Sequence, residues 1–270
     1  MVRRIPDLKA VTELEQDHTT WVGSDSILFA TNHRPWPPPT TPWVMTQRWT
    51  DLLFLHYALS PDVLRPLVPE VLPLDTYNQC AWISITPFWM DHVRPHGSPR
   101  MPFVSRFPEL NVRTYVTYQG KPGVYFFSLD AGSLSAVWAA RIFYRLPYWK
   151  AAMKVRGKGK ADIQYSSKRE HGPKPAVFRA RYGPASAASH AKPGSPEYFL
   201  SERYCLYAVN GKRVYRANIH HLRWPLQQAH FEIEENTMAR VAGIELPSRP
   251  DLANFSRELK VLIWAPERVE

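Results

Sequence analysis

From residue 46 onward the chain consists mainly of short apolar runs and of segments in which apolar and polar residues alternate, and both patterns predict β-strands. Strand-like runs occur at residues 48–57, 81–88, 110–118, 124–129, 153–156, 163–167, 177–182, 203–209, 213–219, 228–234 and 259–264. Turn signals separate several of these runs, and the Asn210-Gly211 dipeptide is the strongest. The pattern therefore predicts roughly ten strands joined largely by hairpins.

Helical signals are few. They cover residues 61–67, 134–145 and 236–241. Only the second is long, with Ser133 as its N-cap and Pro147 as its stop. Many strands with one long helix predict a mainly β (α+β) fold. We expect an antiparallel β-barrel-like fold, closed or nearly closed, with a few helices.

The chain has 270 residues, of which 44% are hydrophobic, so it can bury a sizeable core without disulfides or metals. Residues 1–30 are polar without strand alternation, and we interpret them as an N-terminal accessory segment. Residues 31–270 are predicted to form a single barrel domain. A proline-rich stretch at residues 33–39 opens this domain and should be extended.

Several features favour a cytoplasmic protein. The first sixteen residues contain no apolar run of the kind found in secretory signals. No stretch approaches the roughly eighteen apolar residues of a membrane-spanning helix. Two cysteines, Cys80 and Cys205, are too few for a disulfide framework, and Cys205 is interpreted as a small core residue. The sequence leaves the oligomeric state open, including a homo-oligomer.

The net charge of +10 favours contact with anions. Basic residues concentrate at 150–181, where only Asp162 and Glu170 oppose them. One hypothesis is therefore a nucleic-acid-binding module that uses this segment and loses affinity steeply with salt. Aromatic residues are sparse there, with Tyr165 and Phe178 alone, which weakens the case for base stacking.

A row of polar residues lies where a barrel wall is expected. Alternation places Glu109, Asn111, Arg113 and Tyr115 on one face of their strand, with apolar residues between them. Such groups are costly to bury unless they are paired or bind something. The row is either a strip facing solvent or the polar wall of a cavity that binds a ligand.

Other polar groupings are less informative. Residues 228–234 carry a second polar file, which favours a surface strip. The neighbouring His220 and His221 point to opposite faces of a strand, so they make a poor metal pair. The chain contains no phosphate loop, dinucleotide fingerprint or nucleophile elbow. We expect neither a metal nor a cofactor.

Five segments together resemble the YqjF-like family, a family of unknown function within the acetoacetate decarboxylase-like superfamily. These are Leu64–Pro69, Phe107–Val116, Gly123–Asp130, Glu202–Tyr207 and Ile233–Thr237, and the likeness runs from His33 to the last residue. The resemblance implies a β-barrel-like fold with a central cavity. It also implies a link to enzymes that cleave β-keto acids through a lysine Schiff base.

The resemblance assigns the functional positions of the superfamily to single residues of this chain. The superfamily glutamate falls on Glu109, its helix arginine falls on Arg141, and its nucleophilic lysine is replaced by Tyr148. Because tyrosine cannot form an imine, Lys150 is the nearest candidate nucleophile, with a basic surface residue as the alternative interpretation. Arg48 lies two residues before the position of a second superfamily arginine and shares its strand face.

The hypothesis from these residues is a cavity that binds a small anionic or carbonyl compound. Its candidate catalytic residues are Glu109, Tyr148 and Lys150. Its candidate ligand-binding residues are Arg48, Asn111, Arg113, Tyr115 and Arg141. Whether the protein is an enzyme stays open. If it is, the missing lysine favours acid–base chemistry at a carbonyl group over imine formation.

Overall fold

The computed structural model describes residues 27–97, 106–134, 137–138, 141, 144–172 and 175–270. Its strands are β1 (Met45–Leu59), β2 (Thr76–Tyr77), β3 (Cys80–Pro95), β4 (Phe107–Tyr118), β5 (Lys121–Ala131), β6 (Tyr148–Arg156), β7 (Ile163–Arg169), β8 (Val177–Pro184), β9 (Cys205–Asn210), β10 (Arg213–His220), β11 (Gln227–Asn236), β12 (Leu252–Ile263) and β13 (Glu267–Arg268). The predicted mainly β class is confirmed.

Helices are short and few among these residues. They are α3 (Pro61–Leu64), α5 (Pro196–Ser201) and the 3-10 helices η1 (Arg65–Leu67) and η2 (Ala239–Ala242). Residues 134, 137, 138, 141 and 144 are also helical, at the place of the predicted long helix. None of the helices in the described residues is long and apolar enough to cross a membrane.

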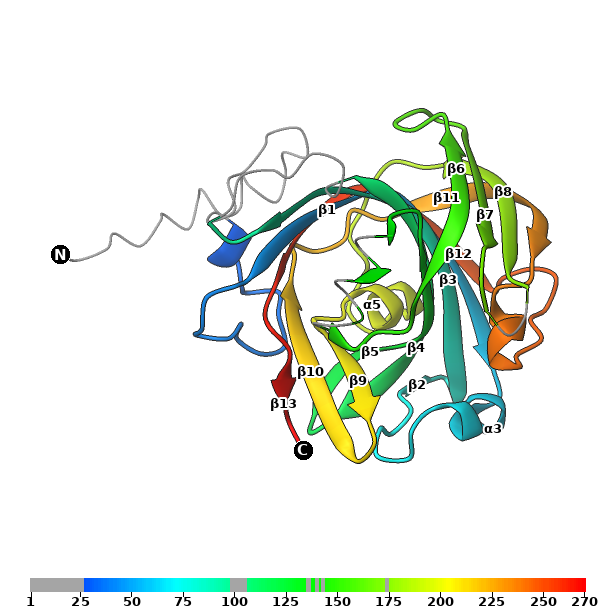
Figure 1. The fold of residues 1–270 in the computed structure, drawn as a ribbon. Coiled ribbons are helices and arrows are strands. Elements are labelled where there is room, and N and C mark those ends of the chain that lie inside the picture. Colours follow the sequence, from blue (N-terminus) through cyan, green and yellow to red (C-terminus); the bar gives the residue numbers. More distant parts are fainter. Residues whose placement is uncertain (1–26, 98–105, 135–136, 139–140, 142–143, 173–174) are drawn as a thin grey trace.

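The main barrel is a closed ring with the strand order β10-β9-β5-β4-β3-β1-β12 (Figure 1). The ring closes where Ile219 and His220 of β10 pair with Ile263 and Leu262 of β12. The predicted barrel is thus confirmed, but it is mixed because β5 pairs in parallel with both β9 and β6. Parallel neighbours need a long crossover, which the segment between β5 and β9 supplies.

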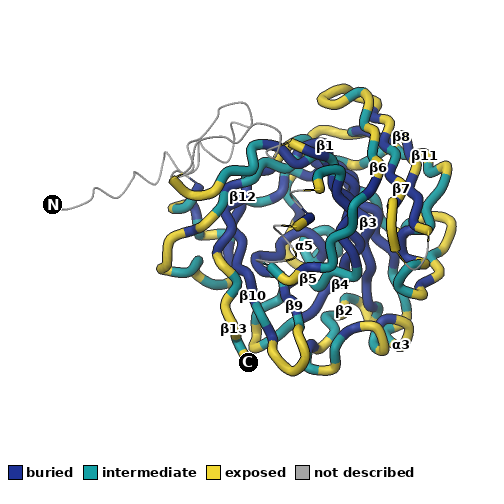
Figure 2. Tube along the Cα trace, in the orientation of Figure 1, coloured by how far each residue is buried: buried dark blue, intermediate teal, exposed yellow. Residues whose placement is uncertain are grey.

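A second layer of strands packs on the outside of this barrel. β6, β7, β8 and β11 are joined to it through the β5–β6 and β11–β12 pairs. Between the layers lies an apolar core, to which Leu53, Ile85 and Val112 contribute from the barrel and Phe178 and Tyr182 from β8. Consequently β1, β3 and β4 are buried on both faces, as the dark strands of Figure 2 show.

One end of the main barrel is covered by α5 (Figure 1). Ser195 caps this helix, since its hydroxyl accepts a hydrogen bond from the Tyr198 amide at 3.2 Å, and Pro196 occupies the first turn. Leu200 packs with Tyr115 and other residues of the barrel wall. The sequence pattern did not predict this helix.

Two predicted turns differ from the structure in detail. Asn210 pairs with Arg213, so the two-residue loop is Gly211-Lys212, and only Gly211 has a positive φ, of 61°. Glycine at the first central position fits a type II′ turn, whereas we expected both loop positions at Asn210 and Gly211. The predicted helix at 236–241 begins later, as a 3-10 helix from residue 239, because β11 extends to residue 236.

The segment before β1 packs against the barrel. Ile27 and Trp43 form a cluster with Leu262 and Trp264. Arg34 is buried and donates from Nη1 to the Ile219 carbonyl at 2.7 Å. Most of the predicted accessory segment, residues 1–26, lies outside the described residues, so the division at residue 30 stays a prediction.

Candidate functional site

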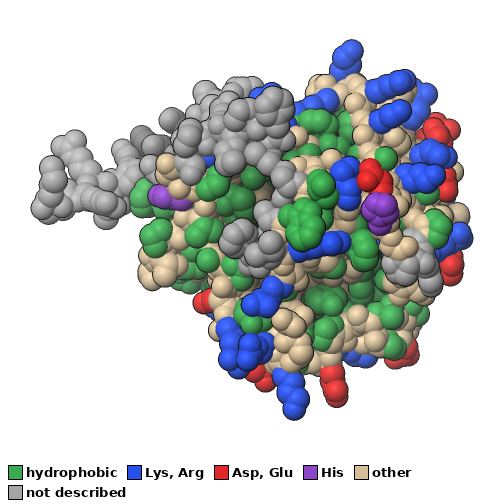
Figure 3. Space-filling model, in the orientation of Figure 1, with side chains coloured by type: hydrophobic (Ala, Val, Ile, Leu, Met, Phe, Trp, Pro, Cys, Tyr) green, Lys and Arg blue, Asp and Glu red, His purple; other side chains and the backbone are tan. Residues whose placement is uncertain are grey.

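The interior of the main barrel holds a cavity of about 840 Å³. Its described lining comes chiefly from β1, β3, β4 and β5, together with Tyr144 and Tyr148, and β9, β10 and β12 add one residue each. Most of these lining side chains are apolar. On the face in Figure 3, hydrophobic side chains gather at the centre, while lysine and arginine lie mostly around the edge.

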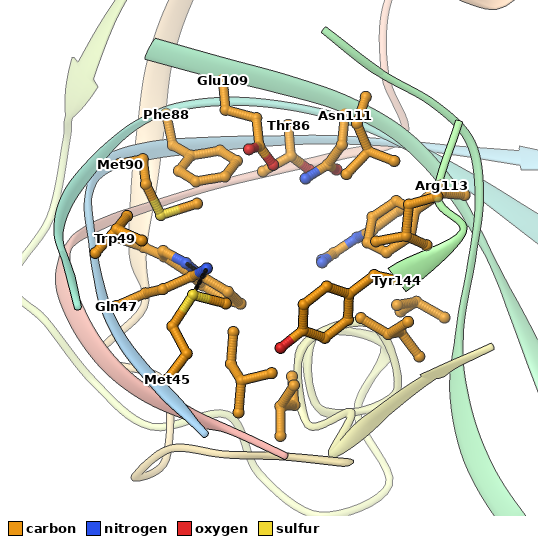
Figure 4. Close-up of a pocket in the computed structure, with 18 of the residues that line it drawn as sticks. Met45, Gln47, Trp49, Thr86, Phe88, Met90, Glu109, Asn111, Arg113 and Tyr144 are labelled. Atoms are coloured by element: carbon orange, nitrogen blue, oxygen red, sulfur yellow. Dashed lines mark hydrogen bonds between the residues drawn. The ribbon is translucent and has the colours of Figure 1, made fainter. Parts of the chain in front are cut away.

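The register between β3 and β4 places most polar lining residues of these strands on one wall of the cavity. Thr86 of β3 lies opposite Asn111 of β4, and Phe88 lies opposite Glu109. All four line the cavity, because side chains two residues apart on a strand share a face. Figure 4 shows the side chains of Thr86, Glu109 and Asn111 together on this wall, with Arg113 farther along β4.

Arg113 is the most unusual of these residues. It is 8% exposed, and its guanidinium points into the cavity (Figure 4). Within the described residues its Nε atom has no hydrogen-bond partner and no carboxylate forms an ion pair with it. Its guanidinium carbon lies 5.4 Å from the ring centroid of Phe54 and 5.9 Å from that of Tyr115. Because arginine stays protonated in proteins, the cavity contains a buried cation for which the described part of the chain supplies no counter-ion.

Close to Arg113, the buried side chains of His56, Ser84 and Tyr115 form a hydrogen-bonded set. Ser84 Oγ is 2.6 Å from His56 Nδ1 and 2.7 Å from the Tyr115 hydroxyl. Burial, with the nearby Arg113 cation, holds the pKa of His56 well below its usual value. His56 is therefore neutral and adds no charge to this end of the cavity.

Glu109 and Tyr148 form a pair on the cavity wall. The Tyr148 hydroxyl donates to Glu109 Oε2 at 2.9 Å. Burial raises the pKa of Glu109 to about 8, against the opposing effect of the Tyr148 hydrogen bond, and the Asp130 charge raises it further. Burial likewise raises the pKa of Tyr148 well above its usual value and that of Tyr144 to about 12. Near neutral pH Glu109 is therefore a carboxylic acid and Tyr144 keeps its hydroxyl proton, so both groups can donate hydrogen bonds within the cavity.

Four candidate residues from the sequence do not line the cavity. Arg48 lies on the opposite face of β1 from Gln47 and Trp49, which do line it, and its Nη2 binds Asp91 at 2.6 Å. Lys150 donates from Nζ to Glu170 at 3.2 Å. The alternative interpretation of Lys150 as a surface residue thus fits its position better than a nucleophile does.

Arg141 is the third. It is exposed, and its Nε donates to the Tyr148 carbonyl at 2.6 Å while its guanidinium lies over the Trp149 ring. Arg141 therefore supports the backbone that carries Tyr148 and does not itself reach the cavity. Tyr115 shares the face of Arg113 but lies beyond the cavity, bonded to Ser84.

The sequence did not identify several lining residues. Met45, Trp49 and Met90 come from β1 and β3, and Tyr144 comes from the helical segment after β5. Apolar residues occupy both faces of β1 and β3, so their spacing gives no signal of which face encloses a cavity. The strong aromatic content of these runs is the one available indication.

Part of the basic segment at 150–181 is paired with carboxylates: among the described residues, ion pairs are formed by Lys150, Lys158, Arg169, Arg179 and Arg181. Arg179 pairs with Glu235 at 2.8 Å, and Arg181 pairs with Asp162 at 2.7 Å. Lys158, at the β6–β7 turn, lies 3.5 Å from the buried carboxylate of Asp91. The polar file on β11 is exposed, as predicted, and adds further acids to this layer. No observation here supports the nucleic-acid hypothesis.

Comparison with known proteins places the chain in a family. Residues 46–260 match the model of DUF2071, described as an uncharacterised conserved protein. The chain belongs to this family. It is also 48% identical to the uncharacterised protein YqjF of Bacillus subtilis (strain 168) over 222 residues, which cover 82% of this chain and 91% of that protein. The resemblance drawn from the five sequence segments is thereby confirmed.

Solved structures similar to this DUF2071 protein share its fold at low identity. The enduracididine biosynthesis enzyme MppR, complexed with pyruvate, matches with a TM-score of 0.58 at 9% identity, covering 87% of this chain and 96% of that one. Acetoacetate decarboxylase from Legionella pneumophila matches with a TM-score of 0.55 at 14% identity, covering 94% and 98%. An acetoacetate decarboxylase-like enzyme from Sphingomonas wittichii RW1 gives 0.57 at 13% identity, covering 88% and 98%. The predicted acetoacetate decarboxylase-like fold is confirmed.

Proposed function

We propose that the barrel cavity binds a small organic acid, with the carboxylate of the ligand on Arg113. The observation that carries this proposal is the unpaired, buried guanidinium that points into a mostly apolar cavity. Leaving a buried charge without its partner costs about 3–5 kcal/mol, so a bound anion is the natural counter-ion. Arginine also matches a carboxylate with two parallel hydrogen bonds.

The second group in the proposal is Glu109. Held protonated near neutral pH, it can donate a hydrogen bond or a proton to a carbonyl or hydroxyl oxygen of the ligand. Tyr148, hydrogen-bonded to the same carboxyl, orients it. No lysine occurs among the described lining residues, so a Schiff base has no support here. A fold neighbour was solved with pyruvate, which fits an organic acid as the ligand class.

Replacing Arg113 tests the proposal. We expect Arg113→Met to weaken binding of butyrate and acetoacetate at least tenfold, because a hydrogen bond to a charged group contributes about 1.5–3 kcal/mol. Without ligand, the variant should be at least as stable as the wild type, since an unpaired buried cation has been removed. Thermal unfolding with and without millimolar acid measures both effects.

Arg213→Met is the matched control. Arg213 is exposed at the start of β10, so this variant loses the same charge without touching the cavity. It should bind acids as the wild type does. Equal ligand-induced shifts in wild type and Arg113→Met, or no shift in the wild type with any acid, would contradict the proposal.

A further inference from the structure

We infer that the ligand is an amphipathic carboxylic acid, whose apolar body of about six to ten carbons fills the barrel between Arg113 and Phe107, a size that a cavity of several hundred cubic ångströms can enclose. This inference rests on the proposed function and names the class of acid. It draws on the part of the cavity that neither Arg113 nor Glu109 explains.

The cavity is long in the strand direction. Phe107 begins β4 and Arg113 lies in the middle of this strand, six residues away, which corresponds to about 20 Å at about 3.3 Å per residue. Both residues line the same cavity. An acid as small as butyrate on Arg113 would leave most of this length without contact.

The stretch beyond Glu109 forms an apolar sleeve. We use this name for Met45, Trp49, Phe88, Met90, Val93 and Phe107, all of which line the cavity. Met90 pairs with Trp49 on one side and Phe107 on the other, so the sleeve is continuous across β1, β3 and β4. Figure 4 shows Met45, Trp49, Phe88 and Met90 together on the wall that faces Arg113 and Tyr144.

The sleeve offers little to a polar ligand. The indole Nε1 of Trp49 already donates to Gln47 Oε1 at 2.8 Å, so both polar groups at this level are bonded to each other. At the other end, Thr86 Oγ1, Asn111 Oδ1 and Arg113 Nε are buried without partners in the described residues. Three unsatisfied polar atoms thus lie near Arg113, whereas beside the sleeve there is Nε1 of Trp224, whose ring stacks on Trp49.

This polarity fixes both the chemistry and the direction of the ligand. The carboxylate lies at Arg113, the first carbons pass Asn111 and Glu109, and the chain end lies among the sleeve residues. Methionine side chains are flexible and polarisable, so Met45 and Met90 can adapt to alkyl or aromatic bodies. A sugar acid or a dicarboxylate would leave a polar group unpaired in the sleeve, which is costly.

A chain-length series tests the inference on the full-length protein. Titration calorimetry with butyrate, hexanoate, octanoate and decanoate should give a Kd that falls about fourfold for each added methylene until the sleeve is full. This factor is the transfer free energy of about 0.8 kcal/mol per methylene, at about 1.4 kcal/mol per tenfold. Octanamide, which lacks the charge, should bind at least tenfold more weakly than octanoate.

A substitution that fills the sleeve with a larger side chain provides the second test, measured as the ratio of octanoate to butyrate affinity. In Met90→Trp the larger side chain should lower the ratio of octanoate to butyrate affinity at least tenfold. If Met90→Trp does not fold, Met45→Phe, at the start of β1, fills the sleeve in the same way. If neither variant folds, the chain-length series on the wild type decides alone.

The outcomes separate the inference from the proposed function. If butyrate binds through Arg113 but affinity does not rise with chain length, the inference is wrong and the proposed function stands. If no acid binds, both are wrong. If octanoate binds Arg113→Met as tightly as it binds the wild type, the assigned direction of the ligand is overturned.

Discussion

Arg113 and Glu109 lie on the same face of β4, four residues apart, yet they form no ion pair. At about 3.3 Å per residue they are separated by about 13 Å along the strand. Burial keeps Glu109 protonated up to a pKa of about 8, so it does not supply the missing negative charge. At the scale of single residues, the cavity therefore keeps a cation free for an external anion.

The raised pKa of Glu109 predicts a specific pH dependence of stability. Below about pH 4.5 the carboxyl is protonated in both states; between about 4.5 and 8 only the unfolded chain loses the proton. The free energy of unfolding should therefore fall as pH rises through this window. Glu109→Gln removes the titration, so its stability relative to the wild type should rise by on the order of 3–5 kcal/mol from pH 4.5 to 8.5.

Urea unfolding of both proteins at several pH values measures this difference. The carbonyl of glutamine can still accept the Tyr148 hydrogen bond, so the variant keeps the local contact. A difference between the two proteins that stays constant from pH 4.5 to 8.5 would show that Glu109 titrates normally.

Individual residues show how much of the site could be predicted from the sequence. The alternation at 109–113 predicted that Glu109, Asn111 and Arg113 share one face, but it left open whether that face meets solvent or a cavity; in the structure the three residues are buried. Arg48 and Lys150 were proposed because they lie near superfamily positions in the sequence. In the structure Arg48 lies on the face of β1 away from the cavity, and Lys150, two residues after Tyr148, binds Glu170 outside it. The partners of these two residues, Asp91 and Glu170, are distant in sequence, and no local pattern indicates them.

At the scale of elements, β1, β3 and β4 separate two interiors. One face of each strand lines the cavity, and the other packs in the apolar core shared with β7 and β8. A strand buried on both faces has a nearly continuous apolar sequence, so the period of two weakens. This is why the existence of these strands could be predicted, whereas the cavity-lining face of β1 could not.

A buried ion pair connects the two layers and predicts a large effect of mutation. Asp130 of β5 and Arg169 of β7 are 0% and 1% exposed, with Nη2 and Oδ1 2.5 Å apart. Asp130→Asn leaves the Arg169 charge without compensation and should lower the free energy of unfolding by about 3–5 kcal/mol. Equilibrium unfolding in urea measures the loss.

The exposed pair of Arg240 and Glu245 provides the matched control. Their side chains are 59% and 74% exposed, so Glu245→Gln should change stability by less than about 1 kcal/mol. If the two substitutions had equal effects, Asp130 and Arg169 would not be holding β5 against β7.

At the scale of the whole molecule, ring closure creates the cavity and α5 covers one end of it. Closure depends on the β10–β12 pair and on β5, which lies in parallel beside strands that follow it only after long crossovers. Hairpins between consecutive strands could be predicted from turn residues. These distant pairings could not, because no local signal specifies them.

The charge distribution of the molecule agrees with an anionic ligand. The net charge is +10, and much of the basic outer layer is paired with carboxylates, as for Arg179 and Arg181. A net positive field increases the rate at which small anions reach the protein, without requiring a polymeric partner. Within the described lining, Arg113 is the cation that such an anion would meet unpaired.

The most direct test of this account is a crystal structure of the protein with octanoate. The account predicts carboxylate oxygens within hydrogen-bond distance of the Arg113 guanidinium, and an alkyl chain that passes Glu109 and ends beside Trp49 and Met90. Octanoate bound elsewhere, or with its carboxylate among the sleeve residues, would contradict it.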